Sequence, residues 1–381
     1  MRAKLIYLDH AATSWPKPRE VLDAVRSCME ESGGNPGRGS HRLASRASDI
    51  LYSCRESAGE LFDAAPERVV FTSGATQGLN TVINGYLQSG DHVLIDSMSH
   101  NAVYRPVYRL AASGKISFDI YDIGDSPSSC LEALERLLRP ETRMVICTHM
   151  SNICAREAPL EAIGRFCREH GLLFIVDGAQ SAGHTALFAD KHHITALSVP
   201  GHKGLLGPQG CGLLIFGKDA PVCEPFATGG SGSHSLDPEM PEELPEHLEA
   251  GTLPVPAIAG LDAGIRLLLR ETPERLGKKY TALGQYFTEE CMRIPEIQLY
   301  GEQKGSVISF TVQGLLPSVT AEYLNRYGIC VRSGYHCAPL AHRSLGSFAT
   351  GTVRISFGYG NTNKEVTRLL EVLDSFCHSI R

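Results

Sequence analysis

The stretch VRSGYHCAPLAH, residues 331–342, places a cysteine directly after a histidine and five residues after an arginine. Cys337 could be a nucleophile, a metal ligand or one more buried thiol among twelve cysteines. Cysteine attacks only as a thiolate, and Arg332 and His336 are near enough in sequence to favour that charged form. A zinc site of His336, Cys337 and His342 is the weakest of these hypotheses, because the chain has no C-x-x-C or H-x₃-H spacing.

The stretch FTSGATQGLN, residues 71–80, runs from an apolar strand through small residues into a helix. The free N–H groups at the start of a helix bind phosphate, and the lack of bulk at Gly74 and Ala75 lets a phosphate approach. A plain strand–turn–helix connection would use the same residues. This motif alone therefore leaves both interpretations open.

Asp177 and Lys203 are candidate functional residues because both are charged residues with apolar neighbours in the sequence. Asp177 ends the run LLFIVD, so its carboxylate needs a partner, either a protonated ring nitrogen or a structural hydrogen bond such as a helix cap. Lys203 lies among glycines and apolar residues in VPGHKGLLGPQGCG. Burial would lower the pKa of this lysine and free its amine to form a Schiff base, whereas the alternative is a surface lysine in a glycine-rich turn.

Together, these features are the parts that a pyridoxal phosphate site requires: a phosphate anchor, an acidic partner for the ring nitrogen and a lysine for the aldehyde. One cofactor explains their presence in this order better than three unrelated structural roles. His100 opens a predicted helix after the run HVLIDS, where it would stack on the pyridine ring and move protons. The alternative for His100 is a helix cap.

Short apolar runs alternate with amphipathic stretches through the first two-thirds of the chain, which is typical of a mostly parallel sheet with helices on both faces. The runs are RVVFTSG, HVLIDS, FDIYDI, MVICTH, LLFIVDGAQ and CGLLIFG, and helices are expected near residues 100–113, 128–139 and 159–170. Loops converge at the carboxyl ends of such strands, so we expect polar residues there to carry function. These residues are Ser73, His149, Asn152, Asp177 and Gln180.

Residues 224–256 are rich in glycine, proline and acidic residues and predict a long functional loop. A helix pattern resumes at AIAGLDAGIRLLLRE, and strands are expected at SVISFTV, ICVRSG and TVRISFG. The last helix is expected to begin with a capping box of Thr362 and Glu365. Its apolar face would carry Val366, Leu369, Leu370, Leu373 and Phe376. The expected fold class is α/β, with a large domain built on a mostly parallel, helix-covered sheet and a smaller C-terminal α/β domain.

Composition weighs against several classes of protein. Apolar residues make up 43% and charged residues 20% of the 381 residues, which is ordinary for a globular protein with a core. A formal net charge of −6 argues against a nucleic-acid partner. No apolar stretch is long enough to span a membrane, and the opening MRAKLIYLDH lacks the apolar region of a secretion signal. A soluble, cytoplasmic protein with reduced thiols and no membrane partner is expected.

The chain resembles the cysteine desulfurase and selenocysteine lyase family, within the class V aminotransferase-like, fold-type I pyridoxal phosphate enzymes. The motifs behind the resemblance are YLDHAATSWPKP, GATQGLN, MSHNAVYRP, THMSNICA, VDGAQSAGH, GHKGLLGPQG, LEAGTLPVPAIAGL, VRSGYHCAPLAH and TVRISFGYGNT. The R-x-G-x-H-C motif at Cys337 is similar to the second desulfurase group, which works with dedicated sulfur acceptors. The resemblance implies a large cofactor-binding domain, residues 16–254, and a small domain of residues 1–15 and 255–381 that carries Cys337 and Arg354.

The resemblance also implies roles for individual residues. Lys203 would bind the cofactor as a Schiff base and shuttle the substrate α-proton, Asp177 would pair with the pyridinium, and His100 would stack on the ring and transfer protons. The other cofactor-binding residues would be Gln180 at the phenolic oxygen, Ala75, Thr76 and His202 at the phosphate, Thr252 reaching the phosphate from the partner subunit of a homodimer, and Asn152, which would lie beside Arg354. The substrate-binding residues would be Arg354, which grips the substrate carboxylate through its planar fork, Asn152, Arg332 and His336.

The implied activity is that of a pyridoxal phosphate-dependent cysteine desulfurase. Such an enzyme converts L-cysteine to L-alanine and leaves the sulfur as a persulfide on Cys337, from which an acceptor protein or a small thiol takes it. The first alternative is a selenocysteine lyase, acting on L-selenocysteine. The second is an aminotransferase or β-eliminating lyase in which Cys337 is incidental, and the third is a scaffold or zinc-binding protein without the cofactor.

Some positions depart from the family pattern. Pro200 stands where relatives carry a hydroxyl residue that contacts the phosphate, so about 1 kcal/mol of hydrogen bonding is lost unless Ser198 or a loop group replaces it. Gly37 and Tyr335 each stand in place of a histidine. The surroundings of the Cys337 thiol therefore differ from the usual pattern. Residues 331–342 are expected to form a mobile segment that carries Cys337.

Overall fold

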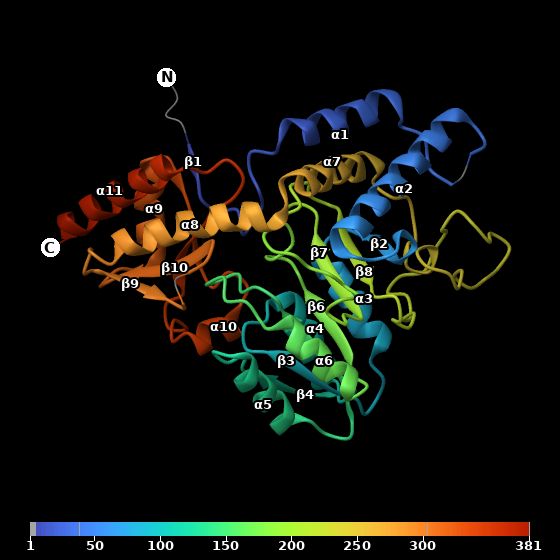
Figure 1. The fold of residues 1–381 in the computed structure, drawn as a ribbon, viewed down its shortest axis with the longest axis horizontal. Helices are drawn as coiled ribbons and strands as arrows, with labels where there is room; N and C mark the ends of the chain where they lie inside the picture. The colour runs from blue at the N-terminus through green and yellow to red at the C-terminus, as the bar shows by residue number, and fades with distance from the viewer. Residues whose placement is uncertain (1–4, 38, 303, 381) are drawn as a thin grey trace.

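A seven-stranded sheet forms the centre of the structure, a computed structural model that describes residues 5–37, 39–302 and 304–380 (Figure 1). The strands lie in the order β2-β8-β7-β6-β5-β3-β4. In chain order they are β2 (Val69–Thr72), β3 (His92–Asp96), β4 (Ser117–Tyr121), β5 (Thr142–Thr148), β6 (Leu173–Asp177), β7 (Ala196–Pro200) and β8 (Gly212–Phe216). Neighbours from β4 to β7 pair in parallel, whereas β8 runs antiparallel to both β7 and β2. The predicted mostly parallel α/β sheet is confirmed.

Helices cover both faces of this sheet, because alternate residues of each strand point to opposite sides. Val93 and Ile95 of β3 face one side, while Leu94 faces the other. The first side packs against α3 (Ala75–Tyr86) and α4 (Asn101–Ala112). The second side packs against α2 (Arg42–Phe62), α5 (Pro127–Leu137), α6 (Leu160–Glu169) and α7 (Val255–Glu271). Burial on both faces explains why β6, β7 and β8 are mainly apolar, whereas the edge strand β4 is partly exposed and contains polar residues.

The predicted helices near residues 100–113, 128–139 and 159–170 are confirmed as α4, α5 and α6, with ends that differ by a few residues. The pattern at AIAGLDAGIRLLLRE is α7, which lies against α1 (Arg19–Glu31) (Figure 1). Sequence reasoning named neither α1 nor α2, nor the short 3₁₀ helix η1 (Pro66–Arg68).

A second, smaller sheet follows α7 in the chain and has four antiparallel strands in the order β12-β13-β10-β9. Its strands are β9 (Ile297–Tyr300), β10 (Val307–Val312), β12 (Arg332–Gly334) and β13 (Thr352–Ser356). The helices of this part are α8 (Pro273–Cys291), α9 (Pro317–Arg326), α10 (Pro339–Ser344) and α11 (Asn363–Ile380). Figure 1 shows this sheet and its helices at one end of the long axis. The predicted smaller C-terminal α/β part is confirmed.

The closing helix α11 begins as predicted in one of two respects. The N–H of Thr362 donates to Glu365 Oε2 at 3.1 Å, which is the glutamate half of a capping box. Within the described part of the chain, the Thr362 hydroxyl makes no matching bond. The predicted apolar face of this helix is buried throughout: it consists of Val366, Leu369, Leu370, Leu373 and Phe376.

The start of the chain ties the two sheets together. Strand β1 (Ile6–Tyr7) pairs in parallel with β11 (Ile329–Cys330), which comes just before β12. Asp9 then bridges to Ser356 at the end of β13. A few residues later, the N–H of Ser14 donates to the carbonyl of His202 at 3.0 Å, in the loop after β7. The N-terminal segment therefore contacts both parts of the molecule, and the domain boundaries 16–254, 1–15 and 255–381 stay a prediction.

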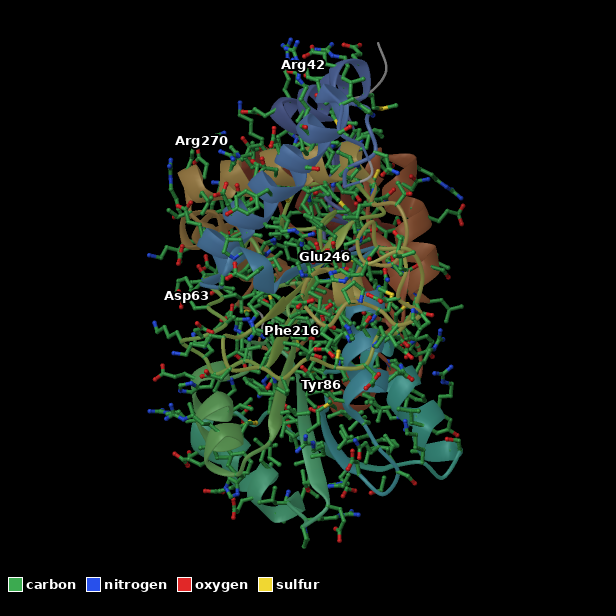
Figure 2. All side chains as sticks on the ribbon, turned by 90° about the vertical axis from the view of Figure 1, so that its right-hand side faces the viewer. Arg42, Asp63, Tyr86, Phe216, Glu246 and Arg270 are labelled. Carbon is green, nitrogen blue, oxygen red and sulfur yellow. The ribbon has the colours of Figure 1, made fainter. Side chains whose placement is uncertain are left out.

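Of the predicted loop, residues 224–254 form most of the connection between β8 and α7, with the 3₁₀ helix η2 (Glu246–Leu248) as their only regular element, whereas residues 255–256 begin α7. Its yellow trace projects from the large sheet in Figure 1, and Figure 2 labels Glu246 near the middle of the molecule, between Arg42 at the start of α2 and Phe216 at the end of β8. The far end of the loop is anchored by Glu249. This carboxylate pairs with Arg55 of α2 at 2.7 Å and accepts the N–H of Phe71 at 2.6 Å. The predicted loop is therefore pinned to strand β2.

Within residues 5–37, 39–302 and 304–380, the structure contains no helix with both the length and the apolar character needed to cross a lipid bilayer.

Candidate active site

A cavity of about 210 Å³ lies where the carboxyl ends of β5, β6 and β7 meet the start of α3. Eight of the residues predicted to bind the cofactor contribute to its wall. They are Ala75, Thr76, His100, Asn152, Asp177, Gln180, His202 and Lys203. Residues that are up to 128 positions apart in the sequence (Ala75 to Lys203) thus converge on one space, as expected for the switch-point edge of an α/β sheet.

The turn from β2 into α3 presents unused hydrogen-bond donors to this cavity. Gly74 has φ 151°, a backbone conformation that favours glycine. The N–H groups of Ala75 and Thr76 have no acceptor within the described part of the chain, as expected for the first turn of a helix. Ser198 does not replace the hydroxyl lost at Pro200, because its Oγ donates to the Ala75 carbonyl at 3.0 Å. This turn can bind an anion through its main chain.

Asp177 and Lys203 face the same cavity with opposite charges. Burial raises the pKa of Asp177, while a hydrogen bond from the Ala179 N–H (2.9 Å) and the charge of Lys203 favour its ionised form. Loss of hydration lowers the pKa of Lys203 to about 8, although the charge of Asp177 opposes this shift. A lysine with this pKa holds a useful fraction of neutral, nucleophilic amine near neutral pH.

His100 combines the two roles that the sequence left as alternatives. Its Nδ1 accepts the N–H of Ala102 at 3.0 Å and so caps α4, while the side chain also lines the cavity. Burial, followed by the charges of Lys203 and Arg354, lowers its pKa to about 4. With Nδ1 accepting a hydrogen bond, the neutral ring carries its proton on Nε2.

The loop that carries Lys203 is held by the N-terminal segment, a contact that sequence reasoning missed. The carbonyl of His202 accepts hydrogen bonds from Lys17 Nζ at 2.8 Å, from the Ser14 N–H at 3.0 Å and from the Thr13 hydroxyl at 3.1 Å. Gln180 Nε2 donates to the carbonyl of Ala11 in the same segment at 3.0 Å. Residues 11–17 therefore fix the backbone next to Lys203.

Arg354 and Arg332 form a positive pair close to Lys203. They lie directly opposite each other on β13 and β12, an arrangement in which like charges repel unless an anion lies nearby. Arg354 is 1% exposed, and its Nη2 donates to Asp9 Oδ1 at 2.8 Å. Its Nη1 donates to the carbonyl of Asn152 at 3.1 Å, and its Nε has no partner among the described residues. The pair can accept a further anionic group, and Asp9 is a site residue that the sequence did not reveal.

Cys337 is the exposed cysteine of the chain: Cys330 is partly exposed, and the others are buried. Cys211 is buried just before β8, and Cys330 is a partly exposed residue of β11. The Cys337 carbonyl accepts the N–H of Asn101 at 2.7 Å, next to His100. The main chain of the residue that carries the exposed thiol thus contacts Asn101, which directly follows a residue of the cavity wall.

His336 lies beside Cys337 in sequence, but its ring is turned into the protein. Its Nε2 contacts the Thr352 carbonyl at 3.2 Å, and the side chain is buried. Burial, followed by the charge of Arg354, lowers its pKa to about 2. A neutral His336 cannot provide the positive charge expected to favour the Cys337 thiolate, so among the two neighbours only Arg332 remains for that role.

Of the remaining predicted residues, Ser73 lines the cavity and most of the others lie outside it. Thr252 is exposed at the end of the long loop, and Tyr335 is exposed beside Cys337 with its hydroxyl donating to the Phe348 carbonyl at 2.9 Å. His149 is buried but is not part of the cavity wall. Pro200 does line the cavity, whereas Gly37 lies in a separate cavity next to the long loop. Residues 331–342 are folded as β12, a turn and α10, and their movement as a carrier stays a prediction.

Comparisons with known proteins match nearly the whole chain. A sequence model of the aminotransferase class-V family matches residues 6–369. The "Probable cysteine desulfurase" of Methanothermobacter thermautotrophicus is 32% identical over 379 residues, covering 97% of this chain and 94% of that protein. The "Cysteine desulfurase" of Salmonella agona is 31% identical over 377 residues, covering 96% and 92%.

Solved structures agree with the sequence relatives. The apo structure of cysteine desulfurase from Thermococcus onnurineus has a TM-score of 0.89 at 30% identity, covering 98% of this chain and 95% of that one. The cysteine desulfurase CsdA from Escherichia coli has a TM-score of 0.87 at 26% identity, covering 99% and 95%. These matches confirm the predicted resemblance and the predicted fold. The chain belongs to the aminotransferase class-V family, and the two relatives described above are named as a probable cysteine desulfurase and a cysteine desulfurase.

Proposed function

We propose that this protein is a pyridoxal phosphate-dependent cysteine desulfurase that takes sulfur from L-cysteine. The observation that carries the proposal is the cavity that joins Lys203, Asp177 and the α3 turn, with an exposed cysteine anchored beside its wall. The names of the relatives support the same activity. An aminotransferase or β-lyase would need the cavity but not the exposed thiol.

The donor groups of the cavity fit pyridoxal phosphate. The unused N–H groups of Ala75 and Thr76 would bind its phosphate, with His202 beside them. Asp177 would pair with the ring nitrogen. The buried Asn152 Oδ1 has no hydrogen-bond partner in the part of the chain described, so it can accept a hydrogen bond from a bound polar group. When bound, the cofactor withdraws electrons from the α-carbon of an amino acid and thereby weakens the bond from Cβ to the sulfur. Lys203 would hold the cofactor, and with His100 it would move protons at the substrate.

The substrate carboxylate would bind at the arginine pair. Arg354 has an Nε without a partner among the described residues and already holds one carboxylate, that of Asp9, and Arg332 lies opposite it. The Cys337 thiolate would then attack the substrate sulfur. The S–S bond forms as the Cβ–S bond breaks, the electron pair stays with the carbon fragment, and a proton completes alanine. Cysteine and thiol become alanine and persulfide, so no external oxidant is required.

Further parts of the proposal concern partners and location. An acceptor protein or a small thiol would take the sulfur from the exposed Cys337. A homodimer would bring the exposed Thr252 of one subunit to the phosphate of the other. Residues 16–254 would form the cofactor-binding domain, with residues 1–15 and 255–381 as the small domain. The cytoplasm would keep the cysteines reduced.

The proposal is tested by the products that the cofactor-loaded protein forms from L-cysteine. We expect L-alanine in every turnover, and sulfide in equal amount when a reducing thiol is present. Mass spectrometry and a sulfide assay measure both. Pyruvate and ammonia instead of alanine would show a β-lyase, consumption of a 2-oxo acid would show an aminotransferase, and a strong preference for L-selenocysteine would show a selenocysteine lyase.

The lowered pKa of Lys203 predicts how the apoprotein takes up pyridoxal phosphate. Only the neutral amine reacts with the aldehyde, so the uptake rate should rise with pH and level off above a half-maximum near pH 8. The growth of the bound-cofactor absorption band from pH 6 to 10 measures this rate. Nα-acetyl-lysine serves as the control, because its amine titrates near about 10.4 and its rate should still rise at pH 10. A protein profile that follows the control would contradict a perturbed Lys203.

A further inference from the structure

Cys337 lies in a tight turn with an uncommon backbone. The N–H of Ala338 donates to the carbonyl of Tyr335 at 2.9 Å, which closes a four-residue turn. The two central residues, His336 and Cys337, have φ 48° and 59°. Two positive φ values in succession are the pattern of a type I′ turn, in which glycine and asparagine are preferred. Residues other than glycine adopt positive φ uncommonly, so two of them in succession require support from contacts outside the turn.

Two hydrogen bonds from outside the turn each hold the carbonyl of one of these residues, in addition to the contact of the His336 ring with Thr352. Asn152 Nδ2 donates to the His336 carbonyl at 2.8 Å. The main-chain N–H of Asn101 donates to the Cys337 carbonyl at 2.7 Å. Asn101 is the first residue of α4, where an N–H has no partner within the helix and is free for this contact. Asn152 is 5% exposed and lines the cavity, and Asn101 follows His100 of the same wall.

We propose that the main-chain N–H of Asn101, together with the side-chain amide of Asn152, seats Cys337 for attack on the substrate sulfur. Both are positioning groups, because they act on the backbone of the nucleophile rather than on the substrate. This inference rests on the proposed desulfurase function. These two hydrogen bonds, called the seat below, fix the backbone of Cys337 to the cavity wall. The thiol therefore stays in a constant position relative to the residues that hold the substrate. A loosened seat lowers the rate of sulfur transfer and leaves substrate binding intact.

A proline at position 101 removes the N–H and little else. The first position of a helix tolerates proline, and His100 already has φ −72° and ψ 157°, the conformation preferred before proline. The cap from His100 to the Ala102 N–H is kept. Asn101→Ala keeps the N–H, and the Asn101 side chain takes no part in the seat. Arg19→Pro is a matched control for proline itself, since Arg19 is the exposed first residue of α1 and also follows an extended residue.

Two measurements on the cofactor-loaded protein test the seat. For Asn101→Pro we expect kcat for alanine formation to fall about tenfold or more, with KM within about twofold of the wild type. Hydrogen–deuterium exchange should become faster in the peptide covering residues 331–342, where the Ala338 N–H closes the turn. Asn101→Ala and Arg19→Pro should match the wild type in kcat and in the exchange of that peptide.

The other possible results contradict either the proposed positioning of Cys337 or the proposed desulfurase function. Wild-type kcat and exchange in Asn101→Pro would overturn the inference while the desulfurase function stands. Equal losses in Asn101→Ala and Asn101→Pro would overturn it too, because the side chain would then be responsible. If the wild type forms no alanine, the proposed function fails, and the exchange data still decide whether Asn101 holds the turn. If Asn101→Pro does not fold, Asn152→Ala must speed exchange in the same peptide, and unchanged exchange overturns the seat.

Discussion

Lys203→Ala is expected to lose the absorption band of covalently bound cofactor and at least about 10³-fold in alanine formation. Lys203 is the lysine of the cavity wall, and loss of hydration there lowers its pKa to about 8. The change removes the amine that reacts with the aldehyde and the base that moves the substrate α-proton. The absorption spectrum of the purified protein and the alanine assay measure the two effects separately.

Lys218→Ala is the control for this substitution. Lys218 is an exposed lysine after β8 and lies outside the cavity wall, so its removal should change neither the spectrum nor the rate. Added methylamine offers a further check, because a small amine can partly replace the lost base. Full activity in Lys203→Ala would contradict the assignment of Lys203 and with it the cofactor mechanism.

The parts of the site that sequence reasoning predicted are those set by local pattern. Asp177 ends an apolar strand and Lys203 follows another, and parallel strands bring their carboxyl ends to one edge. The period of apolar residues therefore predicted both the central sheet and the meeting of these two residues. The apolar face of α11 was predicted for the same reason, because a period of 3.6 residues sets which side chains are buried.

What sequence reasoning missed depends on contacts between distant segments. Asp9 and Arg354 are separated by 345 positions, and nothing near Asp9 in the sequence marks it as the partner of a buried arginine. The hold of residues 11–17 on the His202 carbonyl is likewise set by the path of the chain after β1. Glu249 and Arg55 are a third pair of this kind.

His336 shows how nearness in sequence misleads at a turn. The expectation that it promotes the Cys337 thiolate assumed that neighbouring side chains share an environment. Positive φ at both residues instead turns the His336 ring toward Thr352, while Cys337 faces solvent. The order of residue types in the sequence does not give the backbone angles, and these angles point the two neighbouring side chains in different directions. The role of Arg332 rests on register, which places it opposite Arg354.

Cys337→Ala is expected to lose alanine formation from L-cysteine, to less than about one-thousandth of the wild-type rate, while keeping the spectrum of the bound cofactor. The thiolate of Cys337 takes the sulfur atom, so without it the Cβ–S bond of cysteine has no nucleophile to break it. Alanine fits the turn as well as cysteine does, because both carry one Cβ at φ 59°. The alanine assay and the absorption spectrum test the two halves of this expectation on one sample.

Cys330→Ala separates the loss of this thiol from the loss of any accessible thiol. Cys330 is the partly exposed cysteine of β11, seven residues before Cys337, and lies outside the cavity wall, so its variant should turn over L-cysteine like the wild type. After one turnover, peptide mass spectrometry should find a mass increase of about 32 daltons, that of one sulfur atom, on Cys337 alone. If Cys337→Ala still forms alanine from L-cysteine at full rate, the thiol is incidental. L-selenocysteine then becomes the substrate to compare, because a selenocysteine lyase would release selenium without using the Cys337 thiol. In that case the roles proposed for the cavity residues would stand, and only the role proposed for the Cys337 turn would fall.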